Sequence, residues 1–129
     1  MDEIDRLGEN RSEIAEFRFD EVAHLPLCTY LNLHCNRLEN LQGLPYARLP
    51  NLTELNLSSN EFSSSHLPEL SYLPSLRILD LSANKLQSVI GLPFLPGLET
   101  LSIAYNLITA LDGLEENVPS LIKLDVSDT

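Results

Sequence analysis

A phrase of apolar residues recurs along most of the chain and constrains its fold more than any other feature. The third copy reads Leu76-x-x-Leu79-x-Leu81-x-x-Asn84-x-Leu86. The asparagine slots of the five copies are filled by Asn36, Asn60, Asn84, Asn106 and Thr129. Successive slots are separated by 24, 24, 22 and 23 residues. A period of this size predicts a solenoid, in which each unit packs against its neighbours.

Two further sequence markers recur with the same period as the asparagine slots. A proline stands two residues before the first apolar slot of every copy, at Pro26, Pro50, Pro74, Pro96 and Pro119. A glycine followed by leucine stands seven residues after the asparagine slot, at Gly43, Gly91 and Gly113. Proline suits the loop before a strand, and glycine suits a tight return. The second copy has Leu67 in place of the glycine, after a run of serines, so we expect its return to differ.

The spacing inside the phrase has a physical reason. In Leu-x-Leu the alternation has period two, so both leucines point to one face of a short strand, and stacked copies pair in parallel. The asparagine follows where the chain turns out of the strand, and its amide can both donate and accept hydrogen bonds. We therefore expect an internal ladder that satisfies buried backbone groups, formed by Asn36, Asn60, Asn84 and Asn106.

Over about residues 25–129 these markers resemble those of the leucine-rich repeat family. The short period and the glycine–leucine return look like an intracellular subclass. It includes the repeat regulatory subunit of type-one protein phosphatase and the leucine-rich-repeat axonemal dynein light chain. The resemblance implies an α/β fold, a curved solenoid with a parallel β-sheet on the concave face and short helical or irregular returns on the convex face. It also implies a binding or scaffold role inside the cell.

The fifth copy departs from that pattern. Thr129 stands in the asparagine slot, and the C-terminal capping segment of those relatives is missing after it. Leu121, Leu124 and Val126 would then form an open apolar edge strand, which invites pairing. We expect either a fragment of a longer chain, in which more repeats or a cap would follow, or packing of this edge on another molecule, self-association included.

Residues 1–24 do not form a full repeat, and they carry eight acidic against three basic side chains. Ile4 and Leu7 are spaced for one face of a short helix. Ile14, Phe17 and Phe19 fit slots of the repeat phrase. We predict an N-terminal capping segment, a short helix followed by a strand near residues 16–19, because the first apolar layer of a solenoid would otherwise meet water.

The amino-acid composition limits the classes of partner and the location that we expect for this chain. The net charge is −11, which argues against nucleic acid and against an anionic membrane surface. The first residues are acidic and lack the apolar stretch expected of a secretory signal, and no run approaches the ~20 apolar residues of a membrane span. Extracellular relatives resemble one another in cysteine-rich caps, whereas this chain has two cysteines. An intracellular location is therefore expected, in the cytoplasm or alternatively in the nucleus or a cilium.

No catalytic set and no metal site is predicted. His24, Cys28, His34 and Cys35 lie close in sequence, but their spacing matches no compact zinc pattern. Cys28 fills a leucine slot and is expected in the core. The five glycines form no phosphate-binding loop. We therefore expect no cofactor and no enzymatic activity.

The residues between the leucines should cover the concave face, and most of them are small or polar. The exceptions are Tyr30, His34, Ile78 and Tyr105, flanked by the charged Glu54, Asp80 and Lys123. Exposed aromatic and aliphatic side chains on such a face often anchor a protein partner. The leading hypothesis is a module that binds a partner segment there. The alternatives are a scaffold segment of a larger cytoskeletal or ciliary protein, and a regulatory subunit of an enzyme such as a phosphatase.

Overall fold

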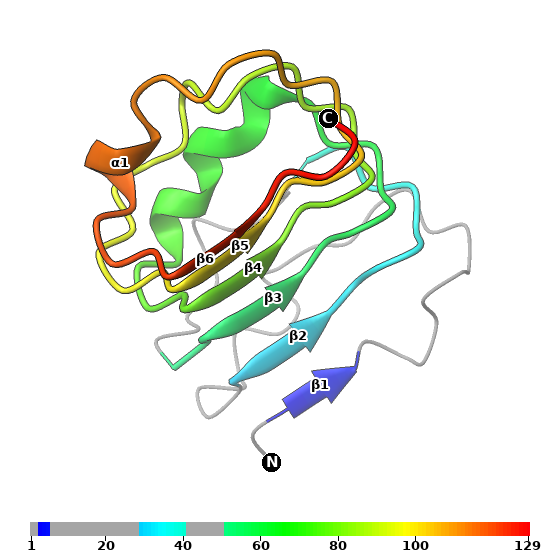
Figure 1. Cartoon of the computed structure of the whole chain (residues 1–129). Helices are drawn as coiled ribbons and strands as arrows, with labels where there is room; N and C mark the ends of the chain where they lie inside the picture. The colour runs from blue at the N-terminus through cyan, green and yellow to red at the C-terminus, as the bar shows by residue number, and fades with distance from the viewer. Residues whose placement is uncertain (1–2, 6–28, 41–50) are drawn as a thin grey trace.

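The computed structural model describes residues 3–5, 29–40 and 51–129. Its centre is one parallel sheet of six three-residue strands in sequence order (Figure 1). The strands are β1 (Glu3–Asp5), β2 (Tyr30–Asn32), β3 (Glu54–Asn56), β4 (Ile78–Asp80), β5 (Thr100–Ser102) and β6 (Lys123–Asp125). Sequence order in a parallel sheet is what a solenoid requires, because each strand pairs only with the strands of the units before and after it. The predicted α/β leucine-rich repeat fold is confirmed.

The register of the sheet follows the repeat phrase. The central residues of β2 to β5 are aligned with one another, as Leu31, Leu55, Leu79 and Leu101. At most 1% of each of these leucines is exposed. Residues at equal offsets from successive asparagines therefore lie side by side, and the inward leucines form a continuous core behind the sheet.

The returns on the far side of the core differ between copies. After β3 the chain forms η4 (Ser64–Tyr72), a 3-10 helix of nine residues that lies behind the strands in Figure 1. Leu67, Leu70 and Leu73 are buried at a spacing of three, which matches the three residues per turn of this helix type. The prediction of a different return in the second copy is confirmed.

The later returns use the predicted glycines. Gly91 has a φ of 100° and Gly113 a φ of 83°, and Gly113 directly precedes the short helix α1 (Leu114–Asn117). Side chains rarely adopt such left-handed angles, so glycine is the residue that permits both turns. Gly43 lies outside the described residues.

The N-terminal prediction was wrong at Ile4, which lies in a strand and not in a helix. Glu3–Asp5 pairs with Tyr30–Asn32, and Ile4 is aligned with Leu31. This strand takes the place beside β2 that the prediction gave to residues 16–19. The polar–apolar–polar order of these three residues fits a sheet edge as well as a helix start. Leu7 and residues 16–19 lie outside the described residues.

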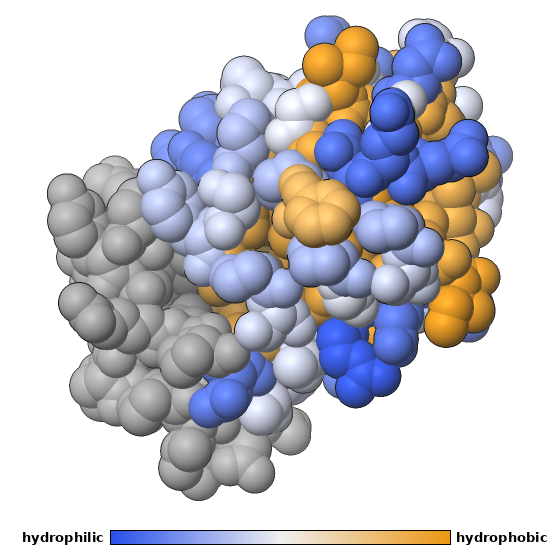
Figure 2. All heavy atoms as spheres, turned by 90° about the vertical axis from the view of Figure 1, so that its left-hand side faces the viewer, coloured by the Kyte–Doolittle hydropathy of each residue, from blue (hydrophilic) through white to orange (hydrophobic). Residues whose placement is uncertain are grey.

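The other end of the sheet is open to solvent. Leu124 is 36% exposed and Val126 38%, whereas Leu101 and Ile103, one repeat earlier, are each 1% exposed. Leu124 also lines a hollow of about 440 Å³, together with Leu114, Glu115, Val118, Pro119 and Leu121. Figure 2 shows apolar side chains gathered at this end, away from the grey residues. In the described part of the chain, no helix has the length and apolar character needed to cross a membrane.

Candidate interaction surface

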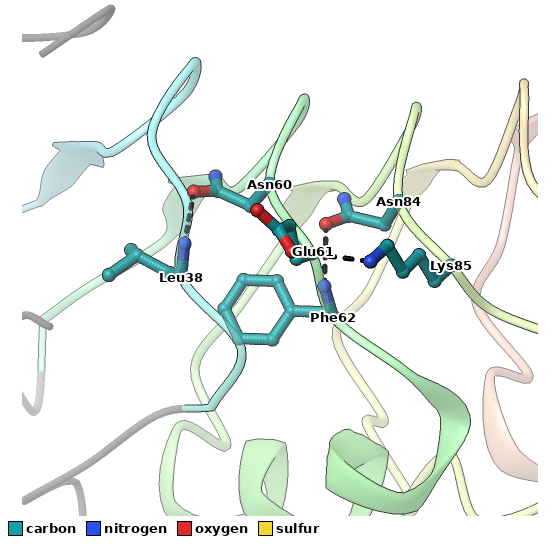
Figure 3. A network of polar contacts seen from close by, with 6 residues as sticks. All are labelled: Leu38, Asn60, Glu61, Phe62, Asn84 and Lys85. Atoms are coloured by element: carbon teal, nitrogen blue, oxygen red, sulfur yellow. Dashed lines mark hydrogen bonds and ion pairs between the residues drawn. The ribbon is translucent and has the colours of Figure 1, made fainter. Parts of the chain in front are cut away.

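Asn60, Asn84 and Asn106 each link their own repeat to the preceding one. The Nδ2 group of Asn60 donates to the carbonyls of Leu57, in its own repeat, and of Leu33, in the repeat before, both at 3.0 Å. Its Oδ1 accepts the N–H of Leu38 at 3.0 Å (Figure 3). One side chain thus satisfies backbone groups on two successive turns of the solenoid.

The same arrangement repeats along the stack. Asn84 donates to the carbonyls of Leu57 and Leu81, each at 3.0 Å, and accepts the N–H of Phe62 at 3.0 Å. Asn106 makes the equivalent contacts one repeat later, to the carbonyls of Leu81 and Ile103 and from the N–H of Leu86. All four ladder asparagines are buried, at 5–8% exposure. Their geometry gives them a structural function, because every amide is turned into the backbone and away from the concave face.

A surface ion pair lies next to the ladder. Lys85 Nζ lies 3.2 Å from Glu61 Oε1, and both residues directly follow a ladder asparagine (Figure 3). The lysine side chain is 64% exposed, so this pair contributes little to stability.

The concave face is built from rows of residues in register. The first strand positions give one row across β2 to β6, formed by Tyr30, Glu54, Ile78, Thr100 and Lys123. The third positions give a second row, formed by Asn32, Asn56, Asp80, Ser102 and Asp125. Neighbours in a row are about 4.8 Å apart. The face therefore presents defined combinations of side chains to anything that crosses the strands.

Three of the seven predicted partner residues share one hollow on this face, and the other four lie outside it. Asp80, Tyr105 and Lys123 lie together around one hollow of about 320 Å³ over β4 to β6, together with Asp125. Tyr30, His34 and Glu54 belong to the β2 and β3 repeats and are half-buried. Ile78 begins β4 and is 39% exposed. The structure brings three of the seven residues into one hollow and spreads the others across the sheet.

The second row holds a feature that sequence reasoning missed. Asn56 Oδ1 accepts the N–H of Ser58 at 3.0 Å and its hydroxyl at 2.7 Å. Asp80 Oδ1 accepts the same two groups of Ser82, at 2.9 and 2.6 Å. We call this arrangement the Asx–Ser clasp. Its signal in the sequence is an Asn or Asp two residues before a serine at a fixed offset in the repeat, and the side chain caps the chain as it leaves the strand.

The third clasp joins Asp125 and Ser127. The hydroxyl and the N–H of Ser127 both donate to Asp125 Oδ1. The hydroxyl hydrogen bond of Ser127, followed by its backbone hydrogen bond, lowers the pKa of Asp125. Desolvation opposes this effect, and the charge of Lys123 adds the smallest lowering. Asp125 is therefore a carboxylate at neutral pH, held in one orientation at the edge of the hollow.

The chain passes through a left-handed residue after each of the strands β2 to β6. Five non-glycine residues at the same repeat position have φ between 52° and 60°, namely Cys35, Ser59, Ala83, Tyr105 and Asp128. Such angles are uncommon outside glycine, asparagine and aspartate. The N–H of Tyr105 donates to the carbonyl of Ser127 at 2.9 Å, and its side chain is 61% exposed. The turn places an aromatic ring at the rim of the hollow.

No group of three or more potential metal ligands is present among the described residues. Cys35 is a free cysteine and is half-buried. His24 and Cys28, which are near His34 and Cys35 in the sequence, lie outside the described part of the chain.

Comparisons with solved structures agree with this geometry. The leucine-rich repeat domain of APL1B is 25% identical with a TM-score of 0.78, over 95% of this chain and 37% of that one. Internalin C2 from Listeria monocytogenes is 24% identical with a TM-score of 0.73, over 90% and 48%. A second internalin of that organism, inlF, is 23% identical with a TM-score of 0.58, over 87% and 38%. The chain thus spans less than half the length of these proteins.

Comparison with families gives two matches. Residues 26–86 and residues 75–98 match two family descriptions that both read leucine rich repeat. The two matches together span residues 26–98, more than half of the chain. No curated protein matches the sequence. The repeat phrase, the parallel sheet and the asparagine ladder are those of the matched family, and the chain belongs to the leucine-rich repeat family.

Proposed function

We propose that the chain is a non-enzymatic interaction module that binds a segment of a partner protein across its concave face. Leucine-rich repeat domains generally mediate protein–protein interaction. The observation that carries the proposal is the exposure of Ile78 and Tyr105, at 39% and 61%, on a face whose rows are fixed in register. Large apolar side chains on a rigid surface are typical anchors of a protein interface.

The dimensions of the face suit a peptide segment. Six strands about 4.8 Å apart give a floor about 24 Å across. An extended segment or a helix of a few turns can contact several strands over that distance. The mixture of apolar residues with both signs of charge fixes the direction of such a segment more than its affinity.

The experiment compares two double variants of the same residue types. Ile78→Ala with Tyr105→Ala removes both anchors from the concave face. The control, Tyr72→Ala with Ile90→Ala, removes a tyrosine that is 53% exposed in η4 and an isoleucine that is 72% exposed in a return. Affinity capture from an extract of the source cells, followed by mass spectrometry, identifies the partner, and titration with that partner measures affinity.

We expect the concave variant to bind at least tenfold more weakly, about 1.4 kcal/mol, and the control to bind like the parent. Circular dichroism and melting should be nearly unchanged in both. Normal binding by the concave variant together with loss in the control would refute the proposal. Tyr30 is half-buried, so Tyr30→Ala serves as a second variant once its stability has been measured.

The captured protein also separates the alternative roles that the sequence suggested. Cytoskeletal or ciliary proteins would support a scaffold role. Phosphatase activity in the captured material would support regulation of that enzyme. In either case the variant pair tests whether the captured protein is bound through the concave face.

A further inference from the structure

The hollow over β5 exists because this repeat carries the smallest outward side chains. Thr100, Ser102 and Ala104 occupy the positions that hold Ile78, Asp80 and Ser82 one repeat earlier. The hollow measures about 320 Å³, and its lining includes Asp80 on one side and Asp125 on the other. Both carboxylates are in register with Ser102, so they stand two strand spacings apart, roughly 10 Å, with a small residue between them.

The negative charge of these two residues is not required by the fold. Asn56 forms the clasp with Ser58 at 3.0 and 2.7 Å, and Asp80 forms it with Ser82 at 2.9 and 2.6 Å. An amide oxygen thus accepts the two hydrogen bonds of the clasp as well as a carboxylate oxygen does. Asparagine at positions 80 and 125 would avoid placing two negative charges across one hollow. The two charges are therefore explained by a group that binds in the hollow and not by the fold.

The clasps also fix where the charge points. In each aspartate the clasp occupies Oδ1, and a carboxylate has further acceptor capacity on its second oxygen. Lys123 is the one basic residue among the described residues that line the hollow. The exposed ring of Tyr105 stands at the rim, where a planar cation could stack on it.

We propose, on the basis of the function proposed above, that the partner segment is basic and places the cationic side chain of an arginine or lysine in the hollow over β5, between Asp80 and Asp125. A guanidinium group can donate to two carboxylates at once, and an ammonium group can reach either of them. The net charge of −11 favours approach of a basic segment.

A peptide selection tests this inference while the partner is still unidentified. A library of displayed random heptapeptides is selected on the purified chain, and the recovered peptides are titrated by fluorescence anisotropy. The test variant is Asp80→Asn with Asp125→Asn, which keeps the clasp geometry seen at Asn56. The control, Glu115→Gln with Glu116→Gln, removes the same number of charges from α1, outside the concave face.

We expect the recovered peptides to be enriched in arginine or lysine. The aspartate variant should weaken their binding at least tenfold, while the α1 control changes it less than twofold. Peptides that need Ile78 and Tyr105 but neither a basic residue nor the aspartates would overturn this inference and leave the proposed function standing. Equal loss in the aspartate variant and the α1 control would also overturn it, because binding would then follow overall charge. Peptides insensitive to every concave change would overturn both proposals.

Discussion

Replacement of Asn84 by alanine tests how the ladder holds the repeats together. Asn84 is 8% exposed, so water has little access to the groups it leaves behind. The change removes the hydrogen bonds that Nδ2 donates to the carbonyls of Leu57, Leu81 and Ser82, and the one that Oδ1 accepts from the N–H of Phe62.

These losses are not equal. The carbonyl of Leu57 still accepts from Asn60, and the carbonyl of Leu81 still accepts from Asn106, each at 3.0 Å. The carbonyl of Ser82 still accepts the N–H of Ser59 at 2.9 Å. The N–H of Phe62 has no other described partner. One buried donor is therefore left unpaired, and we expect Asn84→Ala to lower the free energy of unfolding by about 1–3 kcal/mol.

The neighbouring rung gives an internal comparison. Asn106 Oδ1 accepts two N–H groups, those of Leu86 at 3.0 Å and of Asn84 at 3.1 Å. Asn106→Ala thus leaves two buried donors unpaired, and it should cost more than Asn84→Ala by about 1 kcal/mol or more. Lys85→Ala, which breaks only an exposed ion pair, should change stability by no more than about 1 kcal/mol.

Urea unfolding followed by circular dichroism measures all three variants, and an unchanged m-value shows that the same surface is exposed on unfolding. The ladder interpretation is refuted if Asn84→Ala is as stable as the parent. The argument from the number of unpaired donors is refuted if Asn106→Ala lowers the free energy of unfolding by less than Asn84→Ala does.

Two further predictions follow from single residues. Gly113→Ala should lower the free energy of unfolding by about 1–2 kcal/mol, because a φ of 83° is strained for a residue with a Cβ, although no other atom would lie within 4 Å of the added Cβ. The control is Gly97→Ala, where φ is not positive and the nearest atom to the added Cβ would be 3.7 Å away. Its stability in thermal unfolding should stay within about 0.5 kcal/mol of the parent. Ser127→Ala removes the largest cause of the lowered pKa of Asp125, so an NMR titration should find that pKa raised toward its usual value, and Ser127→Thr should leave it low. The sign follows from the direction of the shift: the clasp favours the carboxylate, so its benefit is present above the usual pKa and is lost as pH falls through the lowered one.

The sheet could be predicted from the sequence because one short unit is repeated. Equal offsets from Asn36, Asn60 and Asn84 fix the register of β2 with β3 and of β3 with β4, so a local pattern specifies long-range contacts. The different second return was also predictable, since Leu67 replaces a glycine in a fixed slot. Its helix type depends on how Leu67 and Leu70 pack, which the slot alone does not specify.

The N-terminal strand could not be predicted in the same way. Three residues around Ile4 are too few for a period of two to be distinguished from a helical spacing, and the pairing with β2 decides between them. The clasps were missed for a related reason. Asp80 and Ser82 both look like ordinary surface residues in the sequence, and only the three-dimensional structure shows that one side chain binds the other and its backbone.

The clasp distinguishes the property that the fold requires at the third strand position from the property that a partner can recognise there. A clasp needs one oxygen acceptor at the third strand position, and Asn56 and Asp80 supply it equally well. The charge of this row can therefore change from repeat to repeat without a change in backbone geometry. Along the row it is neutral at β2 and β3 and negative at β4 and β6, and the more exposed anchors, Ile78 and Tyr105, belong to the β4 and β5 repeats. Because charge and exposed apolar surface meet over the same strands, we expect a bound segment to be anchored over β4 to β6 and to extend from there toward β2.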